Sequence, residues 1–123
     1  MARPRQPGLT ENELEVIELL WTSAPLTVSE IRNRLTKSPL PAYTSLLTLV
    51  QAMEKKGYLK HQSNGKAYSY FPVLKQESFL ANEIKRMAKR LFGGSPGMLV
   101  LNLVEREQLT AEEIESLKKL LEY

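Results

Sequence analysis

The feature that most constrains this sequence is one hairpin-like segment set among stretches whose apolar residues follow helical spacing. Residues 58–62 and 67–71 are rich in aromatic and strand-compatible side chains, and Asn64-Gly65 between them favours a tight turn. Pro72 closes the second strand, because proline has no N–H to donate to a sheet. The pattern indicates a mainly α fold with a small β-hairpin.

Two helices are predicted first. Thr10 with Glu13 and Thr27 with Glu30 form capping boxes, in which a threonine and a glutamate three residues later satisfy each other's backbone N–H groups. The first helix ends in the Thr-Ser-Ala-Pro stretch at 22–25, and the second ends before Ser38. Residues 26–27 are also compatible with a one-bridge strand.

A third helix is predicted from Ala42 to Lys56. Gly57 supplies its left-handed C-cap, and four apolar residues form an inward stripe: Leu46, Leu49, Val50 and Met53. Three helices followed by a hairpin are the order of a winged helix-turn-helix domain, which we assign to residues 1–72.

Residues 73–123 show helical spacing only. Helices are predicted over 76–92, 98–106 and from a capping box at Thr110 and Glu113, with a break at 93–97. Short helices this apolar bury their surface most economically against a second copy, although folding back on the first domain is an alternative. The predicted dimerisation residues are Phe79, Ile84, Met87, Leu91, Leu99, Leu101, Leu103, Ile114, Leu117, Leu120 and Leu121.

Composition excludes most catalytic chemistry. The sequence has no cysteine and no aspartate, and His61 is its only histidine. Disulfides, thiolate metal sites and a Ser-His-Asp triad are therefore impossible. We expect no enzyme, metal or cofactor. No run approaches the roughly 18 apolar residues of a membrane span, so we expect a cytoplasmic protein with no membrane partner.

The net charge of +3 is unevenly distributed. Residues 31–72 contain seven lysines and arginines against Glu54 alone, whereas residues 73–123 are balanced. A local basic surplus suits a polyanionic partner such as DNA. A solvated face that only favours solubility is the alternative.

The third helix carries the predicted recognition residues. With its apolar stripe turned inward, small hydroxyls and a glutamine face outward, and these groups can bond phosphates or base edges. Exposed Leu47 can contact a thymine methyl or have no role. The predicted DNA-binding residues of this helix are Tyr43, Thr44, Ser45, Leu47, Thr48, Gln51 and Lys55. Lys55 and Lys56 are equally explained by stabilising the helix C-terminus.

The hairpin, as the wing, adds Asn64 and Lys66 to the predicted DNA-binding residues, with Lys60 and His61 beside them. These side chains are positioned to straddle a phosphate backbone. Asn64 is also explained by turn chemistry alone.

Several segments resemble the BlaI/MecI (penicillinase repressor) family of bacterial transcriptional repressors. They are Leu9-Thr10-Glu11 with Trp21, residues 42–45 through 55–58, residues 68–72, and the C-terminal stretches 99–105 and 109–114. The resemblance covers nearly the whole chain. It implies a homodimer on a dyad-symmetric operator that represses genes such as those for β-lactam resistance.

The resemblance also implies a proteolytic switch. Family members are inactivated by cleavage of an Asn-Phe bond, whose counterpart here is Asn102-Leu103, so the phenylalanine is replaced. A regulatory protease or sensor is then a partner. Copper-responsive relatives use C-terminal cysteines, which this chain lacks. The main hypothesis is a sequence-specific repressor, and the alternative is a winged-helix module that binds an acidic protein.

Overall fold

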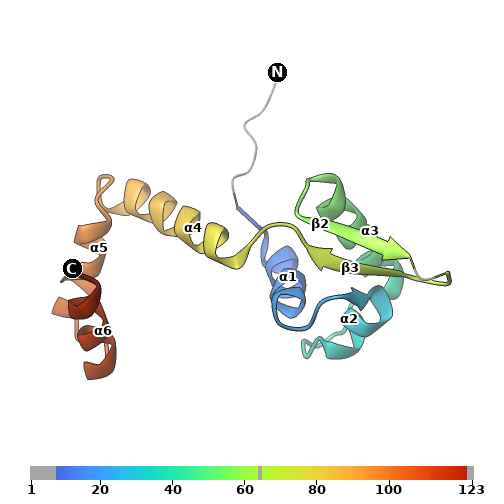
Figure 1. The fold of residues 1–123 in the computed structure, drawn as a ribbon, viewed down its shortest axis with the longest axis horizontal. Coiled ribbons are helices and arrows are strands. Elements are labelled where there is room, and N and C mark those ends of the chain that lie inside the picture. The colour runs from blue at the N-terminus through green and yellow to red at the C-terminus, as the bar shows by residue number, and fades with distance from the viewer. Residues whose placement is uncertain (1–7, 64, 122–123) are drawn as a thin grey trace, which may run out of the picture. The chain divides into compact units, whose positions relative to one another are not determined.

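The computed structural model describes residues 8–63 and 65–121. The chain forms two compact units, one ending at Phe79 and the other beginning at Leu80. Figure 1 labels the helices and strands of both units, and each unit is described separately below.

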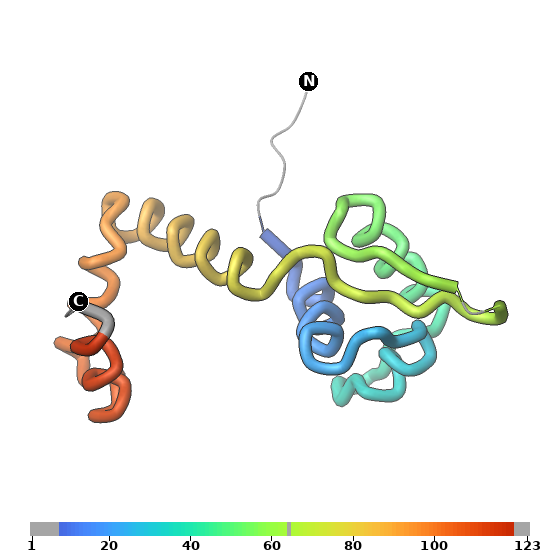
Figure 2. Tube along the Cα trace, viewed as in Figure 1, coloured from blue at the N-terminus to red at the C-terminus, as the bar shows by residue number. Residues whose placement is uncertain are grey.

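The first unit confirms the predicted order of elements. In sequence it contains α1 (Glu11–Ser23), β1 (Leu26–Thr27), α2 (Val28–Arg34), α3 (Tyr43–Lys55), β2 (Leu59–Ser63) and β3 (Tyr68–Pro72). Figure 2 follows this path from α1 in blue to the hairpin in yellow-green. Both predicted capping boxes are present. The strands begin one residue later than predicted, because the chain turns at Lys56 and Gly57 before β2 and bends at residues 65–67 before β3.

The strands form one antiparallel sheet in the order β1-β3-β2. Leu59 pairs with Pro72 and Ser63 with Tyr68, so β2 and β3 make the hairpin. β1 contributes only Leu26, opposite Tyr70, and Thr27, opposite Ser69. This arrangement is the winged helix-turn-helix predicted from the sequence.

The first unit has a continuous apolar core drawn from all its elements. Eleven buried side chains form it: Val16, Ile17, Leu20, Leu26, Val28, Ile31, Leu46, Val50, Met53, Leu59 and Tyr70. Because these residues come from helices on one side and strands on the other, the core fixes α3 against the hairpin.

The boundary between the units lies later than the predicted one at residues 72–73. The Trp21 indole N–H donates to the Leu74 carbonyl oxygen at 2.9 Å. The Trp21 and Phe79 rings lie 5.8 Å apart between centroids. These two contacts hold residues 74–79 against α1 and extend the first unit.

The second unit contains the rest of α4 (Gln76–Leu91), then α5 (Pro96–Glu105) and α6 (Ala111–Leu121). α5 begins at Pro96 rather than at the predicted Met98. The Ser95 hydroxyl accepts from the Met98 N–H, and proline fits the first turn of a helix because it has no N–H to leave unpaired. Ala88 is the only buried residue in the described part of this unit.

Candidate nucleic-acid interface

α3 has one face in the core and one in solvent. Leu46, Val50 and Met53 are at most 2% exposed, whereas Leu49, predicted for the same stripe, is half-buried. Thr44, Thr48, Gln51 and Lys55 are exposed on the other face. The solvent face of α3 therefore presents two hydroxyls, one amide and one ammonium group.

A groove of about 360 Å³ lies between α3, the start of α2 and the hairpin. α3 lines it with Tyr43, Leu47 and Gln51, and the hairpin lines it with Lys66 and Tyr68. Four residues predicted separately from the helix and from the wing thus share one concave surface.

Leu47 and Ser45 differ from the sequence prediction. Leu47 was expected to be exposed, but it is half-buried because it packs on the core and lines the groove. Ser45 is exposed, yet it lines a separate cavity beside α1 rather than the groove. Asn64 lies outside the described residues.

The hairpin is braced against α3 by His61. Its Nδ1 lies 2.8 and 2.9 Å from the two carboxylate oxygens of Glu54, and its ring stacks on Tyr68 with centroids 4.0 Å apart. Burial raises the pKa of Tyr70, and the Glu54 carboxylate raises it further, so this phenol stays neutral. His61, predicted beside the phosphate-contacting residues, thus also holds the wing against α3.

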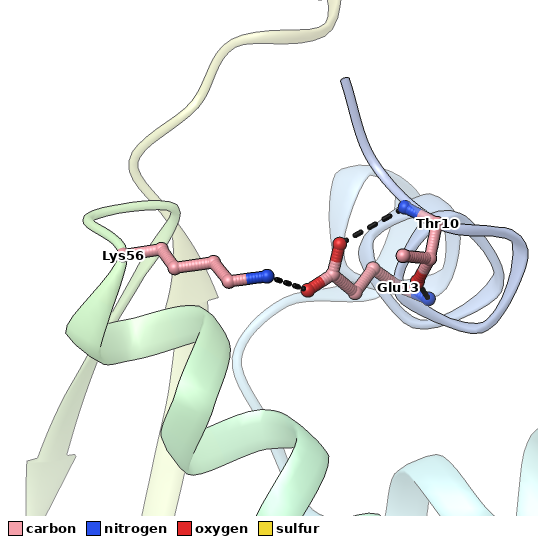
Figure 3. A network of polar contacts seen from close by, with 3 residues as sticks. All are labelled: Thr10, Glu13 and Lys56. Carbon is pink, nitrogen blue, oxygen red and sulfur yellow. Dashed lines mark hydrogen bonds and ion pairs between the residues drawn. The ribbon is translucent and has the colours of Figure 1, made fainter. Parts of the chain in front are cut away.

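A second brace joins the end of α3 to the start of α1 (Figure 3). The Lys56 ammonium donates to a carboxylate oxygen of Glu13 at 2.7 Å, and the other oxygen accepts from the Thr10 N–H at 2.9 Å. Burial raises the pKa of Glu13, but the bonds from Lys56 and Thr10 outweigh it, so the pKa lies below its usual value. Lys56 therefore holds α3 in place.

The remaining cations define the surface offered to a polyanion. Lys37 pairs with Glu15 at 2.7 Å, and the Arg32 Nε donates to the Pro41 carbonyl oxygen. Lys55, Lys60 and Lys66 are exposed, and none of them has an ion-pair partner in the described part of the chain. Lys55 lies at the end of α3, Lys60 in β2, and Lys66 in the turn between β2 and β3.

Tyr68 was missed by the sequence analysis. It is 52% exposed, lines the groove and stacks on His61. A signal was present, because alternate strand residues share a face and Tyr68 lies two residues before Tyr70. Only the tertiary structure shows that Tyr68 lines the same groove as α3.

Comparison with known proteins identifies the family. The family model described as "Penicillinase repressor" matches residues 9–123. The chain belongs to this family. It is a family of transcriptional repressors and not of enzymes.

Named relatives of the penicillinase-repressor family match almost end to end. A "Penicillinase repressor" of Bacillus licheniformis is 28% identical over 116 residues, covering 94% of this chain and 91% of the relative. The "Methicillin resistance regulatory protein MecI" of Staphylococcus aureus (strain N315) is 27% identical over 117 residues, covering 92% of each. The structure titled "Solution structure of the DNA binding domain of the repressor BlaI" aligns with a TM-score of 0.51 at 24% identity, covering 60% of this chain and 90% of that one. The last match supports the fold.

The second unit of this penicillinase-repressor chain exposes much apolar surface. Ile84, Met87, Leu91 and Leu101, all predicted for a dimer interface, are 39–59% exposed. Leu99, Leu103, Ile114 and Leu117 are half-buried. The side chains of Leu120 and Leu121 lie outside the described part. Exposed residues missed by the sequence analysis are Leu80, Met98, Val100 and Val104.

Two kinds of feature are absent from the described residues. Across 8–63 and 65–121, no helix is both long and apolar enough to cross a membrane. Over the same ranges, no group of three or more potential side-chain ligands could hold a metal ion.

Proposed function

We propose that this chain represses transcription by binding a specific double-stranded DNA sequence, with α3 in the major groove and the hairpin on the flanking phosphates. The groove that joins Tyr43, Leu47 and Gln51 of α3 to Lys66 of the wing carries the proposal. A B-DNA major groove admits one α-helix, and a wing beside that helix meets the adjacent backbone.

Base reading is assigned to the exposed face of α3. Thr44 and Thr48 can bond phosphates or base edges, and Gln51 can pair with adenine through two hydrogen bonds. Half-buried Leu47 offers a fixed methyl surface to a thymine methyl group. Because Ser45 lies on the side of the separate cavity, it is the weakest of the predicted base contacts.

Phosphate contacts are assigned to Lys55, Lys60 and Lys66, whose ammonium groups are exposed. Such contacts set register and orientation on the duplex and make binding depend on salt. Lys56 is left out of this set because Glu13 already binds it.

A homodimer on a dyad-symmetric operator is the second part of the proposal. The second unit buries only Ala88 among its described residues and exposes Ile84, Met87, Leu91 and Leu101. An apolar surface of this kind is covered most simply by the same surface of a second copy. Phe79 is omitted from the interface, because it packs on Trp21.

The names of the relatives suggest control of β-lactam resistance genes. We further propose that a protease or sensor lifts repression, as the resemblance to the family implies. The proposed cleavage site, Asn102-Leu103, lies inside α5. The Asn102 side-chain amide donates to the Met98 carbonyl oxygen at 3.2 Å. A protease would therefore have to unwind α5 locally before it could cut.

The test is selection of bound duplexes from a random pool, followed by affinity measurements on the enriched sequence. Thr48→Glu should lower affinity at least about a hundredfold, because it adds a carboxylate next to phosphates at each half-site. The matched control is Thr22→Glu, an exposed position on α1. Unchanged affinity of Thr48→Glu, or no enriched sequence, would reject the proposal and favour an acidic protein partner.

A further inference from the structure

A separate cavity of about 180 Å³ lies in the first unit between α1, α3 and the segment that joins α2 to α3. Its apolar lining comes from all three: Val16 of α1, Leu35 and Pro41 of the joining segment, and Leu46 and Leu49 of α3. Leu49 is half-buried although it belongs to the inward stripe of α3, because this space lies beside it.

The rim of the cavity is polar and carries both signs of charge. Lys37 reaches across it, and its ammonium lies 2.7 Å from a Glu15 oxygen and 2.9 Å from the Asn12 side-chain oxygen. An ammonium has three N–H donors, so one remains for another acceptor. The Ser45 hydroxyl, also on the rim, has no hydrogen-bond partner among the described residues.

Size and charge together select the occupant. An apolar protein cavity of about 150 Å³ holds one benzene molecule, so this cavity suits a single six-membered ring. Because the rim carries both signs of charge, an anion would be repelled by Glu15 and a cation by Lys37. A neutral hydroxyl can accept from Lys37 and donate to Glu15 without breaking their ion pair.

We propose that this cavity is a binding site for a small uncharged aromatic alcohol, and that its occupancy changes the affinity of α3 for DNA. Three lining residues, Ser45, Leu46 and Leu49, belong to α3, so a ring seated here touches the helix that we assign to the major groove. A ligand shifts an equilibrium only as far as it prefers one state. The effect on DNA rests on the function proposed above, whereas the binding does not.

The test uses phenol and the full-length chain in its native oligomeric state. Titration by methyl NMR should shift the signals of Val16, Leu46 and Leu49 and saturate with a dissociation constant of about 1 mM. At about 10 mM phenol the melting temperature should rise by roughly 3 °C or more. Benzoate, which has the same ring with a charge, should bind at least about tenfold more weakly, because Glu15 repels its carboxylate.

Two variants fill the cavity from different lining segments, Leu49→Phe from α3 and Leu35→Phe from the segment that joins α2 to α3, and each should weaken phenol binding at least about tenfold. Leu14→Phe is the matched control, since Leu14 is also half-buried but does not line the cavity. Shifts that do not saturate, or that persist equally in both filled variants, would overturn the binding site. Equal binding of benzoate would overturn the argument for a neutral ligand.

The effect on DNA is read from operator affinity with and without phenol. The affinity of the wild type for the operator should change at least about threefold when phenol saturates the cavity. For Leu49→Phe, the ratio of the affinities with and without phenol should stay near one. An unchanged wild-type affinity with intact phenol binding would overturn the coupling. If the protein binds phenol but binds no specific DNA sequence, only the proposed function is overturned.

Discussion

The ion pair between Glu13 and Lys56 supports a sharp prediction about stability. The Glu13 side chain is 3% exposed and that of Lys56 is 50% exposed. Lys56→Met removes the ammonium and keeps most of the chain length, which leaves a buried carboxylate with only its Thr10 hydrogen bond. A hydrogen bond to a charged group contributes about 1.5–3 kcal/mol, and the exposure of Lys56 reduces this, so we expect a loss of about 1–2 kcal/mol.

The assay is a double-mutant cycle by urea unfolding with Lys56→Met, Glu13→Gln and both together. Glutamine keeps the capping box with Thr10, so the cycle isolates the contact with Lys56. The coupling free energy should be about 1–2 kcal/mol. Lys55→Met is the control, because Lys55 has no ion-pair partner in the described part of the chain. A coupling below about 0.3 kcal/mol would refute the reasoning.

The same pair sets a pH dependence. The pKa of folded Glu13 is lowered, because its bonds to Lys56 and Thr10 outweigh burial, which raises it. Its contribution to stability is therefore present above the unfolded pKa of about 4.3 and is lost as the pH falls through the folded value. In Lys56→Met, only the bonds from Thr10 oppose the effect of burial, so the pKa of Glu13 lies higher than in the wild type. The stability difference between wild type and Lys56→Met should thus shrink from pH 7 to pH 3, and a constant difference would contradict this account.

Three further predictions concern DNA binding and assembly. Lys66→Gln should reduce the slope of log affinity against log salt by about 0.9 per half-site, as measured by titration at several salt concentrations, and an unchanged slope would remove Lys66 from the phosphate contacts. Ile84→Lys with Leu101→Lys should shift sedimentation from dimer to monomer and weaken operator binding, whereas a fully dimeric double variant would reject the proposed interface. His61→Ala should lower operator affinity several-fold by freeing the wing from Glu54, with at most about 1 kcal/mol lost in unfolding, and equal affinity would mean that the brace is not needed for binding.

Local pattern predicted most of the fold. The capping boxes at Thr10 and Thr27 place the helix starts, since each involves residues only three positions apart. Gly57, at φ +91°, ends α3 as its lack of a Cβ allows. The exposed positions of Thr44 and Thr48 followed from helical periodicity alone.

The candidate site was only partly predictable. Sequence reasoning named Leu47 and Lys66 separately, but their common groove depends on how the hairpin lies against α3. It treated Lys56 as a helix-end charge, although its partner Glu13 lies 43 positions away. It placed Ser45 with the base-reading residues, whereas the path of the chain between α2 and α3 puts a cavity beside Ser45.

What the sequence by itself determined is the set of helices and strands, their order and the face that each turns inward. Hydrogen bonds and side-chain periodicity act over a few residues, so these properties can be read from neighbouring positions. Only the tertiary structure decided which charges are paired, that Leu47 is half-buried, and that Tyr68 lines one groove with α3. Those properties depend on distances between residues far apart in sequence, and packing of the common core sets such distances.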